Sequence, residues 1–208
     1  KVFSNITLTY SRYSFNTNFG LTSNQTNENT AINFDYLAGI EDLGGRIDFD
    51  YMPNPNHDIK FGTSYTYHHF FPGEINQNIN ILSSDTLSLD TTLNFSGNTN
   101  VHEMFFYVED NVKITSRLKA NIGLHIGYYS LANNSSTNNI GLIEKINDKN
   151  NLSFQPRVSA RYLLSEDWSI KGSYAKMQQN IHLLSNSSVG FPSDLWVPAI
   201  ASVPSQTS

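Results

Sequence analysis

The chain has 208 residues, of which 38% are hydrophobic and only 15% charged, with a net charge of -5 and no cysteine. The lack of cysteine excludes disulfides, thiolate metal sites and a cysteine nucleophile, and the acidic balance argues against a sequence-independent nucleic-acid binder. Asn, Ser and Thr supply 66 of the 208 residues, a composition that disfavours helices.

Seven runs of alternating apolar and polar residues predict seven β-strands, and no amphipathic helix is indicated. The first strand lies within residues 5–13 and the second within residues 34–51. Apolar residues of the second run change parity between Ile40 and Ile47. We therefore expect a β-bulge near residues 43–45.

A Pro- and Asn-rich turn at 53–57 leads to the third predicted strand, over residues 59–67. The clearest pair follows at 104–114 and 118–128, and only residues 115–117 separate its two arms, which predicts a tight hairpin.

The last two predicted strands cover residues 154–162 and 168–174, with a turn at 165–167 between them. The other connections are much longer and rich in Asn, Ser and Thr. We expect them to be loops, at about 17–31, 71–101, 131–151 and beyond 180.

Short turns thus alternate with long loops, which is the asymmetry of an outer-membrane barrel, with short periplasmic and long extracellular connections. No run approaches the roughly 18 apolar residues of a transmembrane helix, but barrel strands need no such run. The sequence therefore predicts an all-β, up-and-down antiparallel transmembrane β-barrel segment. A soluble or surface-attached glycan-binding β-sandwich, with the same strands around a dry core, is the alternative.

Two features favour the barrel. The faces opposite the apolar ones carry charges and glycines, and aromatic residues lie near the strand ends, as in the aromatic girdles of membrane barrels. These aromatic residues are Tyr10, Tyr51, Tyr67, Tyr128, Tyr162, Trp168 and Tyr174. The apolar halves of the alternating runs predict a lipid-facing set, in which Asp110 is the weak point because it shares the apolar parity. The set is Phe106, Val108, Ile122, Leu124, Ile126, Val158 and Ile170.

Several stretches resemble the TonB-dependent outer-membrane receptors of Bacteroidetes-type bacteria, in order and spacing over most of the chain. They are DFDYMPNPNH (48–57), IKFG (59–62), HFFPG (69–73), VEDNVKITSRLKANIGLH (108–125), QPRVSARY (155–162), IKGSYAKM (170–177), IHLLSN (181–186) and PSDLWVP (192–198).

This resemblance implies a plug domain inside a barrel of about 22 strands, which imports a nutrient with energy from the inner-membrane TonB complex. Its partners would be outer-membrane lipid, the TonB complex through the plug, the nutrient ligand and a surface lipoprotein, with no nucleic acid. No plug or signal peptide is recognisable, and the chain starts at Lys1 rather than Met. We therefore expect residues 1–208 to be a partial barrel domain of a longer receptor.

No catalytic, cofactor or metal site is expected. His57, His68 and His69 suggest a metal site, but His68 and His69 are neighbours in a predicted strand, so they point to opposite faces and cannot both ligate one ion without distortion. Glu103 and Glu109 are about 20 Å apart at strand rise, too far for an acid/base pair.

The ligand-contact residues that we expect are loop aromatics and lumen-side cations. They are His69, Phe70, Phe191, Trp196, Arg157 and Arg161. The other interpretation is that the lumen-side charges hydrate the interior and pair with groups of the plug or of neighbouring strands. These charges are Arg157, Arg161, Lys171, Lys113 and Glu109.

Overall fold

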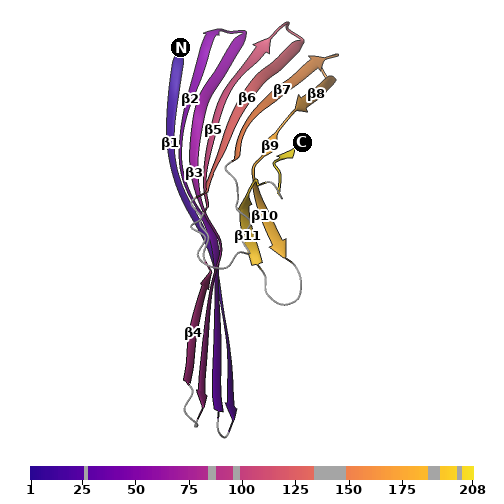
Figure 1. Ribbon diagram of the computed structural model, residues 1–208. Helices are drawn as coiled ribbons and strands as arrows, with labels where there is room; N and C mark the ends of the chain where they lie inside the picture. Colours follow the sequence, from indigo (N-terminus) through magenta and orange to yellow (C-terminus); the bar gives the residue numbers. More distant parts are fainter. Residues whose placement is uncertain (26–27, 84–87, 96–98, 134–148, 187–192, 201–202) are drawn as a thin grey trace.

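The computed structural model of the chain is all-β (Figure 1). It describes residues 1–25, 28–83, 88–95, 99–133, 149–186, 193–200 and 203–208. Among these residues no helix is long and apolar enough to cross a membrane. The strands are β1 (Val2–Gln25), β2 (Glu28–Asn54), β3 (His57–Ser83), β4 (Ser88–Phe95), β5 (Thr99–Lys113), β6 (Leu118–Asn133), β7 (Lys149–Leu163), β8 (Ser169–Ala175), β9 (Gln178–Gln179), β10 (Ile181–Asn186), β11 (Ser193–Pro198) and β12 (Gln206–Thr207).

One antiparallel sheet runs in the order β1-β2-β3-β5-β6-β7-β8, and Figure 1 shows that it curls. The three predicted tight turns, at 53–57, 115–117 and 165–167, all lie at one end of this sheet. In the hairpin between β5 and β6, Thr115 Oγ1 accepts the Leu118 N–H at 2.9 Å. The prediction of seven up-and-down strands with short turns is thus confirmed.

The loops predicted at 17–31 and 71–101 are wrong for the described residues, because strands continue there. The first three strands run on beyond the curled sheet as an extension, in which β4 pairs with the end of β3 (Figure 1). Cα pairing between β1 and β2 continues without a break to Gln25 and Glu28.

The extension forms because apolar alternation persists beneath its Asn-rich composition. Phe19 pairs with Phe34, and Leu21 with Ile32, at successive positions of one face. On the other face the Asn18 side chain donates a hydrogen bond to Asp35. Of the loop predicted at 131–151, residues 134–148 lie outside the described part of the chain.

The bulge predicted near residues 43–45 is also misplaced. Pairing of β2 is continuous there on both sides, and its register with β3 shifts instead between Leu37 and Gly39. Ile40 and Ile47 therefore lie on opposite faces of one regular strand. Ile40 is 7% exposed in a small apolar core, which explains the change of parity.

This core lies on the concave side of the sheet, where the β10–β11 hairpin packs against the strands (Figure 1). Its buried members are Ile40, Phe70, Val101, Tyr129, Leu131 and Ala199. The expectation that this face carries only charges and glycines is thus wrong at one level of the sheet. Among the described residues the seven predicted strands lie in one curled layer, and β10–β11 is a small two-stranded sheet that covers only part of it. The β-sandwich alternative, with the same strands around a dry core, is therefore not what the chain adopts.

Candidate functional site on the inner face of the sheet

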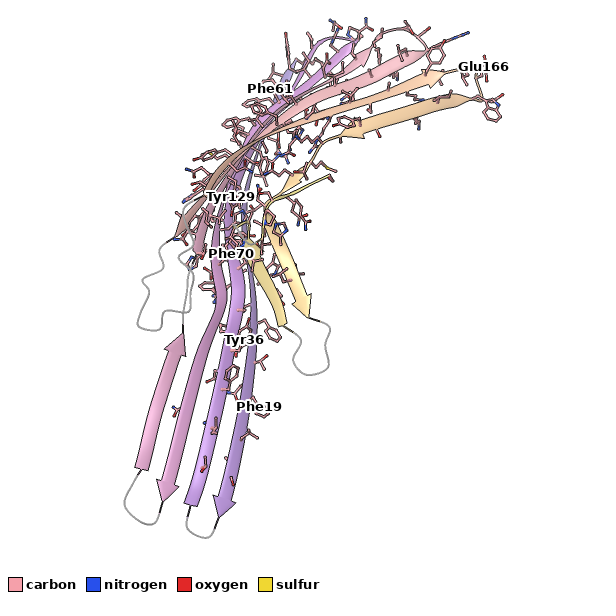
Figure 2. The ribbon with its side chains drawn as sticks, turned by 45° about the vertical axis from the view of Figure 1, so that its right-hand side comes forward. Phe19, Tyr36, Phe61, Phe70, Tyr129 and Glu166 are labelled. Carbon is pink, nitrogen blue, oxygen red and sulfur yellow. The ribbon has the colours of Figure 1, made fainter. Side chains whose placement is uncertain are left out.

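The antiparallel register divides the side chains of the curled sheet between two faces. We call the face that carries the hairpin the inner face. Figure 2 shows Phe70 and Tyr129 on this side and Phe61 on the opposite, outer face. Along β5 the inner face receives Glu103, Phe105, Tyr107 and Glu109, and the outer face receives the even-numbered residues from 104 to 112.

The outer face is apolar and uncovered. Cross-strand pairing places the seven residues of the predicted lipid-facing set on this one face. Six of them are exposed, from 38% at Leu124 to 61% at Ile170. Asp110 lies among them, and its Oδ2 is 2.7 Å from His57 Nδ1. This hydrogen bond gives the Asp110 carboxylate a local partner.

A polar row limits the apolar outer surface on the side away from the short turns. Arg12 and Glu41 form an ion pair of 3.1 Å there, and His69 Nδ1 lies 2.6 Å from Asn100 Oδ1. Next to this row, toward the short turns, aromatic rings gather: His102 contacts both Tyr65 and Tyr67. The outer face therefore has an apolar band with an aromatic edge.

The inner face carries a connected polar network at the middle of the sheet. Tyr107 O–H donates to Asp48 Oδ1, and its ring stacks on His125 with centroids 5.2 Å apart. Asp48 also accepts a hydrogen bond from Arg46 Nε at 2.7 Å, while His125 Nε2 lies 2.7 Å from Glu109 Oε1. These groups form a polar wall with partners for its charges.

Glycines on either side of β5 let this wall lie flat. A Cβ at Gly62 would approach Tyr107 Cε1 to 2.8 Å, and one at Gly123 would approach Glu109 Cγ to 2.8 Å. Larger residues at these two positions would lift the Tyr107 and Glu109 side chains away from the sheet. The glycines thus serve close packing across the strands.

His68 is the centre of a second inner-face cluster, opposite Val101 and farther from the short turns than Met104. Its Nδ1 lies 2.7 Å from Asp42 Oδ1 and its Nε2 lies 3.5 Å from Glu103 Oε2, with the side chain 8% exposed. Burial alone would lower the pKa of His68, but the two carboxylates outweigh it and raise that pKa above its ordinary value. The cluster therefore favours the imidazolium.

Residues 180–186 and 193–200, which we call the inward segment, cover this cluster. Asn180 Nδ2 donates to Glu103 Oε1 at 3.0 Å, and Tyr129 O–H donates to the Ala199 carbonyl at 3.0 Å. Ile181, Trp196 and Ile200 pack against the apolar core. The curled sheet ends with β8, and β9 pairs with β12 in a separate two-stranded sheet, with Gln179 opposite Gln206, so that the two ends of the segment meet. The inward segment is therefore an excursion into the concave side.

The six predicted ligand-contact residues do not converge on one place. Phe70 is fully buried in the apolar core and Trp196 packs against that core, whereas His69 lies on the outer face. Arg157 and Arg161 are on the inner face nearer the short turns. Phe191 lies outside the described residues. In the part of the chain that is described, no group of three His, Cys, Asp or Glu side chains is placed to hold a metal ion.

The His68 cluster and the inward segment were missed from the sequence. One signal was present: Phe70, Val101 and Leu131 are apolar residues at positions of polar parity. Such residues indicate that something covers the polar face locally. What covers it depends on a contact between residues 70 positions apart, as between Tyr129 and Ala199, and alternation carries no information about such a contact.

Comparison with protein families gives one match, which covers most of the chain. The family described as TonB dependent receptor-like, beta-barrel, matches residues 2–193. A search of curated proteins gave no match.

Proposed function

The chain belongs to the TonB-dependent receptor-like β-barrel family, and from this premise we propose that it is part of a receptor that imports a nutrient ligand across the outer membrane with energy from the TonB complex. Members of such a family are transporters and not enzymes. The curled sheet would then be a segment of a transmembrane barrel of about 22 strands. Residues 1–208 would be a partial barrel domain of this longer receptor, of the Bacteroidetes type.

The observation that carries the proposal is the contrast between the two faces of the sheet. A membrane barrel needs an apolar outer band, edged by aromatics, around a polar lumen. The outer face has this band, with Phe106 53% and Ile122 56% exposed, while the inner face has the polar wall around Tyr107. Lipid would cover the seven outer-face residues named above.

The proposed membrane-spanning segments are residues 104–113 of β5 and 118–128 of β6, which match the 9 to 11 residues that a tilted strand needs. The row with the Arg12–Glu41 ion pair and the His68 cluster would then lie outside the membrane. Because the short turns lie at one end, we assign them to the periplasm and the extension to the cell exterior.

Ligand would first meet the exterior parts of the chain. Trp196 and the inner-face Arg157 are the candidate contacts that a ligand in the lumen could reach, and Arg161 follows nearer the periplasm. Phe70 would be reached only after the inward segment moves, since it is fully buried. His69 and Phe191 remain candidates for contact at the rim. We propose in addition that the receptor couples to TonB through a plug domain and that it has a surface lipoprotein as a partner.

Fractionation and uptake test this function. The full receptor should co-fractionate with the outer membrane, and cells should lose uptake of its nutrient when TonB is deleted and when the receptor is deleted. A freely soluble, monomeric receptor would contradict the proposal. Uptake that is unchanged without TonB would contradict the energy coupling.

A further inference from the structure

The inward segment stands on a base that is tied to itself. Met177 N–H donates to the Ser208 carbonyl at 2.9 Å, and Ser208 N–H donates back to the Met177 carbonyl at 3.0 Å. β9 and β12 pair beside these bonds, and we call the two short strands the stem. Before the stem, Lys176 N–H still donates to Pro156 of the curled sheet at 3.0 Å. The stem is therefore the point at which the excursion separates from the sheet.

The backbone of the inward segment is satisfied without the sheet. β10 and β11 pair with each other along their length, and Ala199 N–H donates to the Asn180 carbonyl at 2.7 Å. Among the described residues of the excursion, these backbone hydrogen bonds run from one part of it to another. If the segment left the inner face, the ladder of the curled sheet would therefore stay paired.

Side chains hold the inward segment on the sheet, and their packing is incomplete. The Tyr13 and Trp196 rings meet edge to face with centroids 6.5 Å apart. Beside them an open hollow of about 420 Å³ lies between the segment and strands β1 and β2. His182 is 5% exposed, and its Nε2 has no hydrogen-bond partner among the described residues. A permanent core leaves few such voids and few buried polar atoms without partners.

One carboxylate joins the segment to the sheet. Glu103 accepts the Asn180 hydrogen bond with Oε1, while its Oε2 lies 3.5 Å from His68 Nε2. His68 is held in turn by Asp42, which also accepts a hydrogen bond from Ser11 Oγ at 3.3 Å. We call Asp42, His68 and Glu103 the clasp. His68 thus positions the carboxylate that receives the segment.

We propose that the inward segment is a hinged cover, which lifts off the inner face as one unit about the stem, and that the clasp holds it closed through Asn180. Structural units with few buried contacts open independently of the rest of a protein. Lifting exposes Phe70 on the sheet side of the contact and Ala199 on the segment side. That this opening admits a ligand from the lumen rests on the proposed function, whereas the opening itself does not.

Thiol labelling on both sides of the contact tests the cover. Residues 1–208 contain no cysteine, and Ala199 and Val101 are each 0% exposed, one on the segment and one on β5. Ala199 bonds to Asn180 and Tyr129 through its backbone, so Ala199→Cys keeps these bonds. In the full receptor in lipid vesicles, with other cysteines replaced, Ala199→Cys and Val101→Cys should both label slowly.

Asn180→Asp places a second carboxylate against Glu103 and removes the donor. A hydrogen bond to a charged group changes an equilibrium about tenfold or more, so labelling at both sites should accelerate at least about tenfold. The matched variant Asn180→Asp with Glu103→Gln restores a donor and an acceptor and should bring both rates back to within about threefold of the parent. Amide exchange in β5 and β6 should be the same in all variants.

Three results would overturn the inference. Faster labelling of Ala199→Cys alone would mean that the segment frays without leaving the sheet. Unchanged rates in Asn180→Asp, or rates that Glu103→Gln does not restore, would refute the clasp. Faster amide exchange in β5 and β6 would mean that the sheet itself opens. None of these rates depends on transport, so a receptor that labels as expected but supports no uptake would contradict the proposed function and not the cover.

Discussion

Replacement of Leu124 by Arg is the sharpest perturbation of the outer face. Leu124 lies near the middle of the proposed span 118–128, between Val108 and Pro156 on the neighbouring strands, and is 38% exposed. Arginine at a lipid-facing position near the bilayer midplane costs about 2–4 kcal/mol. This corresponds to a change of about 30-fold to about 900-fold in the folding equilibrium.

The matched control is Asn121→Arg, on the same strand but on the inner face. It removes the hydrogen bond that Asn121 donates to Asn111 at 2.7 Å, a loss of about 1 kcal/mol. The neighbouring inner-face positions are poor controls. A side chain at Gly123 would collide with Glu109, and replacement of His125 would break its contacts with Glu109 and Tyr107.

Guanidinium unfolding of the full receptor in lipid vesicles measures both costs. The Leu124→Arg variant should lose at least about 1 kcal/mol more stability than Asn121→Arg. Equal losses for the two variants, or a larger loss for Asn121→Arg, would refute the assignment of the outer face to lipid.

Three further predictions concern the inward segment and the orientation of the sheet. Tyr129→Phe removes the buried hydrogen bond to Ala199 and should destabilise the packed inward segment by about 1 kcal/mol. Hydrogen exchange within the segment should then be faster, and an unchanged exchange rate would contradict the role of this bond. Because the pKa of His68 is raised, the stabilisation from its carboxylates is complete below the ordinary value of 6.5 and is lost as the pH rises through the raised value. Amide protection factors in the inward segment, which correct for the intrinsic rise of the exchange rate with pH, should thus fall as the pH rises above 6.5 in the parent and not in His68→Gln; a parent whose protection factors do not fall would contradict the prediction. In intact cells an impermeant thiol reagent should label Thr22→Cys in the extension and leave Ser116→Cys unlabelled, and the reverse pattern would invert the topology.

The sequence predicts the curled sheet well where the signal is local. Alternation over residues 104–128 and the three residues between the two arms define β5, β6 and their hairpin without any tertiary information. The seven outer-face residues share a face for the same reason, since side-chain parity has a period of exactly two in a regular strand.

Non-local contacts are where sequence reasoning fails. Composition suggested loops at the end of β1 and the start of β2, but pairing satisfies their backbone groups, and the Phe19–Phe34 pair continues the parity of Ile40 on the inner face. Ile40 looked like evidence for a bulge, although its burial against the inward segment is the actual reason for its parity. The Asp42–His68–Glu103 cluster draws on three strands, and only the register shows that these residues meet.

Spin labels placed one at a time along residues 104–109 of β5, in the full receptor in lipid vesicles, test the central claim most directly. The account predicts a period of two. Labels at the outer-face positions Met104, Phe106 and Val108 should be more accessible to oxygen. Labels at the inner-face positions Phe105, Tyr107 and Glu109 should be more accessible to a water-soluble nickel complex. Equal access of the nickel complex to both sets would mean that water bathes both faces of the sheet, and would contradict the claim that the outer face lies against lipid.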